Sequence, residues 1–254
     1  MKRLFLLALC MSACAVGARA QTMMDLSTID LGIQQIQDNT FVFNSINQGM
    51  AVGSGDSSGR TNSRRRPAPG APNGGTTGGA GHPVAAGQTT FRPVAASIMP
   101  QRLGAQMGRT PQERERLEKF FALLLKDYKE MAVQRGAPLN DVARASSFAV
   151  GTSYDVYNEG RMLGDKAFQA VRAQMYEALA ASPKFRAMGD RERQEMYESY
   201  IILGQFVSAA YESAGKTNDK ELANKMHNLA RIMLEGAFGV SVERLRFTDE
   251  GVRF

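Results

Sequence analysis

The amino-acid sequence predicts an all-α protein, an antiparallel bundle of about five helices over residues 111–237 with a short extended C-terminal tail. Apolar residues in this range recur at spacings of three and four, which is typical of amphipathic helices. The connections between these segments are short and contain glycine, proline or capping residues, so consecutive helices should be antiparallel neighbours. No alternating strand patterns separate the helices, which argues against an α/β sheet.

The first predicted helix has the clearest boundaries. Thr110 can serve as the N-cap, Pro111 as the first helical residue and Glu113 as the capping-box partner. Gly136 and Pro138 end the helix. Its apolar stripe consists of Leu117, Phe120, Phe121, Leu124, Tyr128 and Met131.

Four further helices are predicted by the same spacing. The second covers residues 140–160, the third 165–181 and the fourth 190–214, and the fifth begins with Asn218 as its cap. The fourth is the most apolar, and its uncharged run from Ser199 to Tyr211 is too short to cross a membrane. We therefore expect this helix at the centre of the bundle.

The N-terminus predicts export. Two basic residues are followed by the apolar run Leu4–Val16, and Ala18 and Ala20 form an A-x-A site before Gln21. These are the parts of a secretory signal peptide over residues 1–20. The expected location is the periplasm or the extracellular space.

Both cysteines of the chain, Cys10 and Cys14, lie in this leader. Cleavage after Ala20 leaves a mature protein without cysteine, which its hydrophobic core alone must stabilise. The alternative is cleavage before Cys14, with a lipid anchor attached to that residue.

Two segments separate the leader from the helical domain of residues 111–254. Residues 21–50 form a short N-terminal arm whose apolar spacing fits either a helix or a strand. This arm either packs on the domain or stays loose, or it docks on a partner to which it adds a helix or a strand. Residues 51–110 are interpreted as a low-complexity, mostly disordered linker, since Gly, Pro, Ser, Thr, Ala and Arg dominate residues 51–92.

The net charge of +6 does not indicate a nucleic-acid partner. The leader contributes +3, residues 21–50 contribute −3 and residues 51–110 contribute +6, while residues 111–254 hold 21 basic and 21 acidic residues. The helical domain is therefore neutral overall and lacks the basic excess of a nucleic-acid-binding domain. No transmembrane helix is expected in the mature chain.

Several short motifs support a family resemblance. They are PLNDVA at 138–143, YDVYNEG at 154–160, RQEMYE at 193–198 and RLRFTDEG at 244–251. Together they resemble a group of uncharacterised exported bacterial proteins with a signal peptide, a low-complexity linker and a helical C-terminal domain. The resemblance covers about residues 95–254. It implies this architecture, and it brings no functional residues.

The chain shows no catalytic or metal-binding motif, and no cofactor is expected. GDSSG at 55–59 matches a serine-nucleophile pattern but lies in the linker, without the required strand and turn. His227 has no acidic residue three or four positions before it, so the ligand pattern of di-iron bundles is missing. The acidic pairs Asp155/Glu159 and Glu195/Glu198 are interpreted as solvated surface residues.

These observations favour a non-enzymatic interaction or structural module of the cell envelope that binds an unknown envelope or extracellular protein. One alternative is a small-ligand or anion-binding module with a pocket between the second and fourth helices. A second alternative is an enzyme of unrecognised type. The candidate residues for a groove between those helices are Tyr154, Tyr157, Tyr197, Tyr200 and Tyr211.

Overall fold

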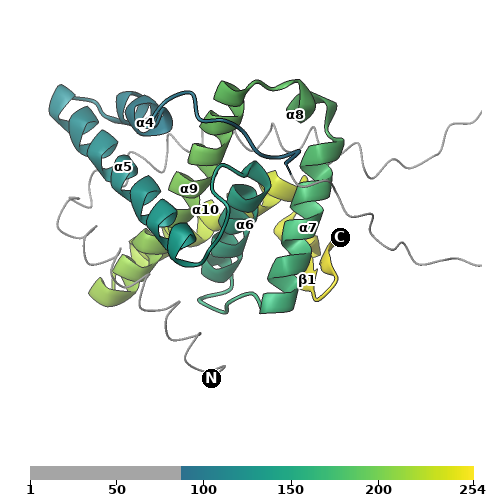
Figure 1. Cartoon of the computed structure of the whole chain (residues 1–254). Helices are drawn as coiled ribbons and strands as arrows, with labels where there is room; N and C mark the ends of the chain where they lie inside the picture. The colour runs from purple at the N-terminus through teal and green to yellow at the C-terminus, as the bar shows by residue number, and fades with distance from the viewer. Residues whose placement is uncertain (1–86) are drawn as a thin grey trace, which may run out of the picture.

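A computed structural model describes residues 87–254 of the chain. This part contains seven α-helices, one short 3-10 helix and one two-stranded sheet (Figure 1), which confirms the all-α prediction. The elements are α4 (Met99–Met107), α5 (Pro111–Gln134), α6 (Val142–Tyr157), α7 (Asp165–Ala181), α8 (Pro183–Ala187), α9 (Asp190–Thr217), α10 (Lys220–Phe238), η1 (Val242–Arg244), β1 (Arg246–Thr248) and β2 (Gly251–Arg253).

The leader, the arm of residues 21–50 and the first part of the linker, residues 51–86, lie outside the described residues. The predicted cleavage residues Ala18, Ala20 and Gln21, and the candidate lipid site Cys14, fall there as well.

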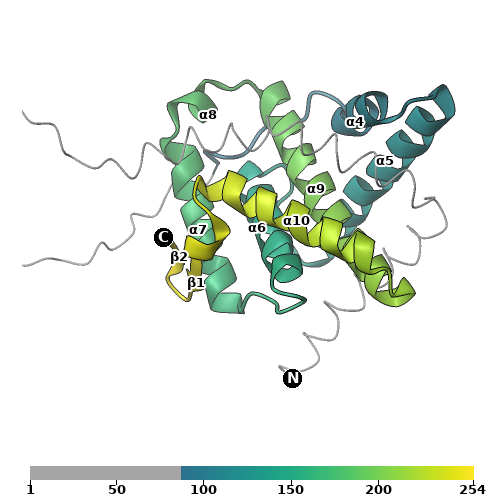
Figure 2. The same ribbon diagram turned by 180° about the vertical axis from the view of Figure 1, so that it is seen from behind.

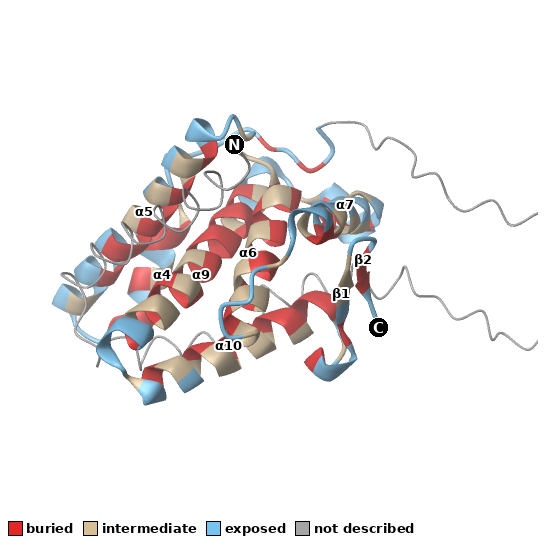
Figure 3. Cartoon of the chain, turned by 90° about the horizontal axis from the view of Figure 1, so that it is seen from below, coloured by how far each residue is buried: buried red, intermediate tan, exposed pale blue. Residues whose placement is uncertain are grey.

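Helices α9 and α6 form the centre of the bundle. They pack against each other, α10 crosses both, α5 lies against α9 on one side, and α7 lies against α6 on the other. Figure 3 shows buried residues along most of α9 and α6, whereas α5 and α7 have wide exposed faces. The central place of α9 agrees with its uncharged run from Ser199 to Tyr211.

The local helix signals are accurate where the cap and the helix are adjacent in sequence. The Thr110 hydroxyl accepts a hydrogen bond from the Glu113 N–H at 3.2 Å, and the Glu113 carboxylate accepts one from the Thr110 N–H at 3.2 Å. Helix α7 spans Asp165–Ala181, the range that was predicted. The capping box and the proline at the first helical position therefore confirm the predicted start of α5.

The boundary between α9 and α10 differs from the prediction. Helix α9 extends to Thr217, and Asn218 takes the left-handed conformation (φ 54°) that ends it. The cap of α10 is Asp219, whose carboxylate accepts a hydrogen bond from the Leu222 N–H at 3.0 Å. The prediction of Asn218 as the cap of the fifth helix was wrong, because this residue closes the preceding helix instead.

The short helix α8 was not predicted, because Ser182 and Pro183 were interpreted only as the end of the third helix. The Ser182 hydroxyl accepts a hydrogen bond from the Phe185 N–H at 3.3 Å, and Pro183 is the first helical residue. The same two residues thus end α7 and begin α8.

The predicted boundary between linker and domain at residue 111 was also wrong. Within the predicted linker, residues 87–110 lie on the bundle and include α4, which packs along α5. Gly104 permits this contact, because a Cβ at that position would lie 2.8 Å from the Arg114 carbonyl oxygen. The folded domain therefore includes the last part of the predicted linker.

The C-terminal tail is extended, as predicted, and forms a hairpin. Strand β1 pairs antiparallel with β2, with Arg246 opposite Arg253, Phe247 opposite Val252 and Thr248 opposite Gly251. The hairpin covers a second cluster of buried apolar side chains between α6, α7 and α10, apart from the main core. In Figure 2 it lies at the margin of the bundle, next to the C-terminus.

Candidate functional site

A network of buried polar side chains holds an extended segment on α9. We call residues 88–98 the strap. The strap runs parallel to the N-terminal half of α9, where Asp190, Gln194 and Glu198 recur every four residues and so share one face. Gln194 is 2% exposed and Glu198 is 1% exposed, although both residue types normally lie at the surface.

Glu198 binds the end of the strap and the start of α4. One carboxylate oxygen accepts hydrogen bonds from the N–H groups of Ile98 and Met99, both at 2.8 Å, and the other accepts from the Gln194 amide at 2.8 Å. Ile98, the N-cap of α4, has no side-chain acceptor of its own. Glu198 therefore supplies from another helix both the acceptor and the negative charge that a helix N-terminus favours.

Gln194 binds the middle of the strap. Its carbonyl oxygen accepts from the Val94 N–H at 2.8 Å and, more weakly, from the Ala95 N–H at 3.4 Å. Its amide nitrogen donates to the Ala95 carbonyl at 2.8 Å. The side-chain amide thus pairs with the strap backbone as a neighbouring strand would.

Arg193 and Asp190 bind the beginning of the strap. The Arg193 guanidinium donates to the Thr90 carbonyl at 3.0 Å and lies over the Phe185 ring at 4.6 Å. The Asp190 carboxylate accepts from the Arg92 N–H at 3.2 Å. The hydrogen bonds of Arg193 and Asp190 to the strap are made to its backbone groups. They therefore depend little on the side chains of the strap.

The loop before α6 holds the other side of the strap. Asp141 accepts a hydrogen bond from the Thr89 hydroxyl at 2.7 Å, and the Thr89 carbonyl accepts one from the Val142 N–H at 3.0 Å. The Phe91 ring contacts Tyr197 edge to face, with 5.3 Å between centroids. Polar contacts therefore fix the strap on two sides, and an aromatic side chain anchors it in the core.

The sequence interpretation of the Glu195/Glu198 pair was half right. Glu195 forms surface ion pairs with Arg102 and Arg191, at 2.8 Å and 3.2 Å. Glu198, in contrast, is buried and bonded to backbone. A hint in the sequence was its position at the edge of the most apolar stretch of the chain, together with Gln194 one turn earlier.

The prediction of a tyrosine-lined groove was wrong, because the five tyrosines lie in different surroundings. Tyr197 contacts Tyr128 and Phe91, Tyr154 makes a tilted ring contact with Phe247, and Tyr157 stacks on His227 at 4.7 Å. Tyr200 is buried and Tyr211 is half-buried at the margin of the main core. Helical spacing gave the right helices but could not show which neighbour each ring faces.

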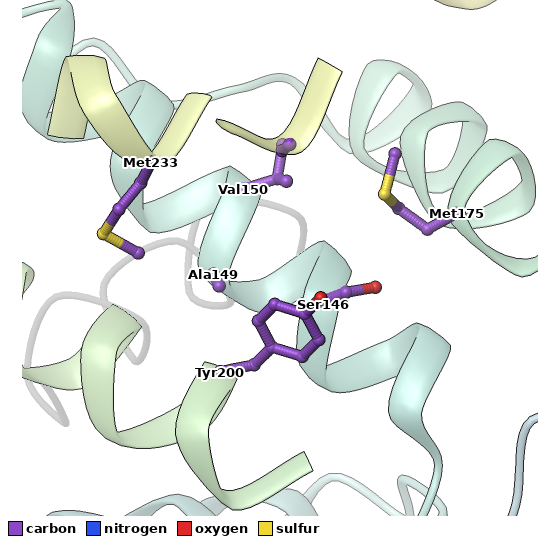
Figure 4. Close-up of a pocket in the computed structure, with 7 residues that line it drawn as sticks. Ser146, Ala149, Val150, Met175, Tyr200 and Met233 are labelled. Atoms are coloured by element: carbon purple, nitrogen blue, oxygen red, sulfur yellow. The ribbon is translucent and has the colours of Figure 1, made fainter. Parts of the chain in front are cut away.

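A small cavity does lie between α6, α7, α9 and α10 (Figure 4). Ser146, Val150, Met175, Tyr200 and Met233 line it, mostly with apolar atoms. It has room for about one water molecule. A cavity of this size is a packing gap rather than a ligand pocket.

Asp155 is a second carboxylate whose surroundings are unusual. It lies near the C-terminal end of α6 and accepts a hydrogen bond from the Leu163 N–H at 3.0 Å. Burial raises the pKa of the Asp155 carboxyl to about 6 from an ordinary value of 3.8, and the hydrogen bond opposes this shift only in part. Its predicted partner in an acidic pair, Glu159, lies in the loop after the helix.

Residues 87–254 contain neither a metal-binding cluster nor a membrane-spanning helix. No group of three or more His, Cys, Asp or Glu side chains is arranged to hold a metal ion there. No helix in the same range combines the length and the apolar character needed to cross a bilayer.

The fold and the site define a class of protein, an all-α bundle whose N-terminal strap is bound by polar side chains of its central helix. The whole chain, residues 1–254, matches the model of a family of unknown function, DUF6683, and the protein belongs to that family. The membership confirms the predicted resemblance to an uncharacterised family with a helical domain. No curated protein and no solved structure matches the chain.

Proposed function

We propose that this protein is an exported, non-enzymatic interaction or structural module of the cell envelope. The observation that carries the proposal is the strap, because residues far apart in sequence are used to fix the point where the N-terminal region joins the bundle. Gln194 and Glu198 lie about 100 residues after the strap atoms that they bind.

A fixed junction has a mechanical meaning for a tethered domain. The segment before residue 87 includes a Gly- and Pro-rich stretch whose composition is typical of flexible linkers. A tether is useful when it connects two bodies, and the strap gives the chain a defined attachment on one of them. The partner in this proposal is a protein of the envelope or the extracellular space, bound by the bundle or by the arm of residues 21–50.

The bundle offers candidate contact positions for such a partner. Val133, near the end of α5, is 63% exposed, and α5 carries a wide exposed face. Scattered apolar side chains at a surface are common and do not identify an interface by themselves. They do provide good positions for a crosslinking probe.

The test is site-specific crosslinking in the host cell. A photoreactive residue replaces Val133, a second protein carries the same residue at Lys184 on the exposed part of α8, and a third carries it at Phe43 in the arm. We expect one defined envelope protein crosslinked from the arm or from α5, and absent from the other positions. The intact mass of the mature protein, measured on the same preparation, tests cleavage before Gln21 against lipid attachment at Cys14.

Two results would contradict the proposal. The first is a mature protein that retains its leader and remains in the cytoplasm. The second is an equal, non-specific crosslinking pattern from all three positions.

A further inference from the structure

The two edges of the C-terminal hairpin differ in how their backbone groups are satisfied. On the β2 edge, the Val252 N–H donates to the Gln174 side-chain oxygen at 2.7 Å, and the Gln174 amide donates to the Val252 carbonyl at 3.2 Å. A side chain of α7 thus takes the place of a third strand. The β2 edge is closed.

Among the described residues, the β1 edge has no such partner. Phe247 lies opposite Val252, and the polar groups of Val252 point away from β1. In an antiparallel ladder, the two residues of a non-hydrogen-bonded pair both direct their N–H and C=O groups away from the partner strand. Because Val252 does so, the N–H and C=O groups of Phe247 also point away from β2. Within residues 87–254, no backbone or side-chain group forms a hydrogen bond with them. An open edge of this kind is a template for another strand.

The charges around Phe247 fit a second copy of the same strand. Arg244 and Arg246 precede Phe247, and Asp249 and Glu250 follow it. If two β1 strands pair antiparallel about Phe247, Arg246 faces the partner's Thr248, and Arg244 lies toward the partner's Glu250. Two-fold symmetry repeats each contact, so the acidic turn of each hairpin meets the basic side of the other.

The hairpin itself gives a second reason for a negative neighbour. Arg246 lies directly opposite Arg253 within the sheet, and like charges at facing positions destabilise a strand pair. Arg253 forms an ion pair with Glu250, but the partners of the Arg246 guanidinium are the carbonyls of Glu243 and Leu245. An acidic turn from another molecule would offset this repulsion.

We propose that β1 pairs with β1 of a second copy of this chain, which joins the two hairpins into a four-stranded sheet around a two-fold axis. This inference goes beyond the proposed function and does not depend on it. The pairing leaves the core intact, since Phe247 already contacts Tyr154 and Phe238 with its ring and would add only its backbone groups.

The test is sedimentation velocity of the processed full-length protein over a concentration series, with charge-reversal variants. Arg244→Glu and Glu250→Arg each place like charges at the contact, twice per dimer, and should weaken dimer formation about tenfold. The double variant restores opposite charges and should regain most of the affinity. Arg116→Glu, an exposed reversal on α5 far along the chain from the hairpin, is the matched control and should leave the affinity unchanged.

Amide hydrogen exchange gives an independent reading that needs no variant. The Phe247 amide should exchange rapidly at low protein concentration and become protected as the concentration rises. A protein that stays monomeric over the whole series would overturn the proposal. A dimer that is insensitive to both single reversals, or that leaves the Phe247 amide unprotected, would also overturn it, because the interface would then lie elsewhere.

Discussion

The strap and the C-terminal hairpin are both extended segments that lie on the helical bundle, and they are held there by different means. The strap forms only an isolated bridge with Asp141 and depends on side chains of α9 for most of its other contacts. The hairpin has its own ladder and borrows one side chain, Gln174, for one of its edges. An extended segment can thus be ordered by a remote helix or by local pairing.

The difference also concerns what remains available for binding. At the strap, the buried Gln194 and Glu198 side chains are matched by backbone groups of the same chain, so that surface is already occupied. At the hairpin, one edge is matched and the other is open among the described residues. The hairpin is therefore the segment that offers backbone groups for a new contact, whereas the strap is a structural anchor.

The sharpest way to break the strap is Glu198→Ala. The substitution removes the acceptor of the Ile98 and Met99 N–H groups and one of the two acceptors of the Gln194 amide, so we expect a loss of about 3 kcal/mol or more in the free energy of unfolding, measured by urea titration. Glu198→Gln keeps one acceptor oxygen and should lose less. The control Glu195→Ala removes only exposed ion pairs and should cost under about 1 kcal/mol. Equal losses for Glu198→Ala and Glu195→Ala would show that the strap adds little to stability.

Asp155 extends the comparison to carboxylates on the hairpin side of the bundle. Glu198 accepts three hydrogen bonds, whereas Asp155 accepts one, from Leu163. Its pKa of about 6 lies above the ordinary 3.8, so the folded state binds the proton more tightly and stability should fall as the pH rises from about 4 to about 6.

Asp155→Asn keeps the acceptor oxygen for the Leu163 N–H and removes the titration. At pH 7.5 the variant should be more stable than the natural protein by about 1–2 kcal/mol, after allowance for partial exposure, and at pH 3.5 the two should be nearly equal. Urea titrations at the two pH values measure both differences. A gain that is the same at both would exclude Asp155 as the source of the pH dependence.

The smallest expected effect is at the hairpin edge. Gln174→Ala removes the two hydrogen bonds to Val252 and should cost about 1 kcal/mol. The loss should be local, with faster amide exchange at Val252 and unchanged exchange at Ile98 and Met99. Gln169, earlier in α7, offers the control substitution Gln169→Ala. If amide exchange at the strap also accelerates in Gln174→Ala, the strap and the hairpin are energetically coupled. The two segments would then not be independent, as the comparison assumes.

The parts of the fold that the sequence could predict are those in which the interacting residues lie close together in the sequence. The cap of α5 and the residues that it serves lie within three positions of each other, and the range of α7 follows from its own apolar spacing. The boundary at Asn218 was missed because a residue between two helices can end one or begin the other. Local sequence offers no means to separate these roles when Asp219 follows.

The strap was missed because its stability comes from distant residues. The helical spacing of Met99, Leu103 and Met107 in the neighbouring α4 was present in the sequence, but these residues fell inside the segment 51–110 that was interpreted as linker. Glu198, which accepts hydrogen bonds at the end of the strap and the start of α4, is 100 residues away from Ile98. The tyrosine groove failed for a related reason, because spacing assigns a ring to a helix face but does not assign the helix that covers it.

The parallel course of strap and α9 has a consequence under load. Successive strap residues bind successive turns of α9, Arg92 to Asp190, Val94 to Gln194 and Ile98 to Glu198. A force that pulls the chain at residue 87 back along the strap axis acts in shear, so these bonds resist together rather than opening one after another. We expect the domain to bear tension at its N-terminal junction far better than at the short C-terminal hairpin, whose two strands can be peeled from the end.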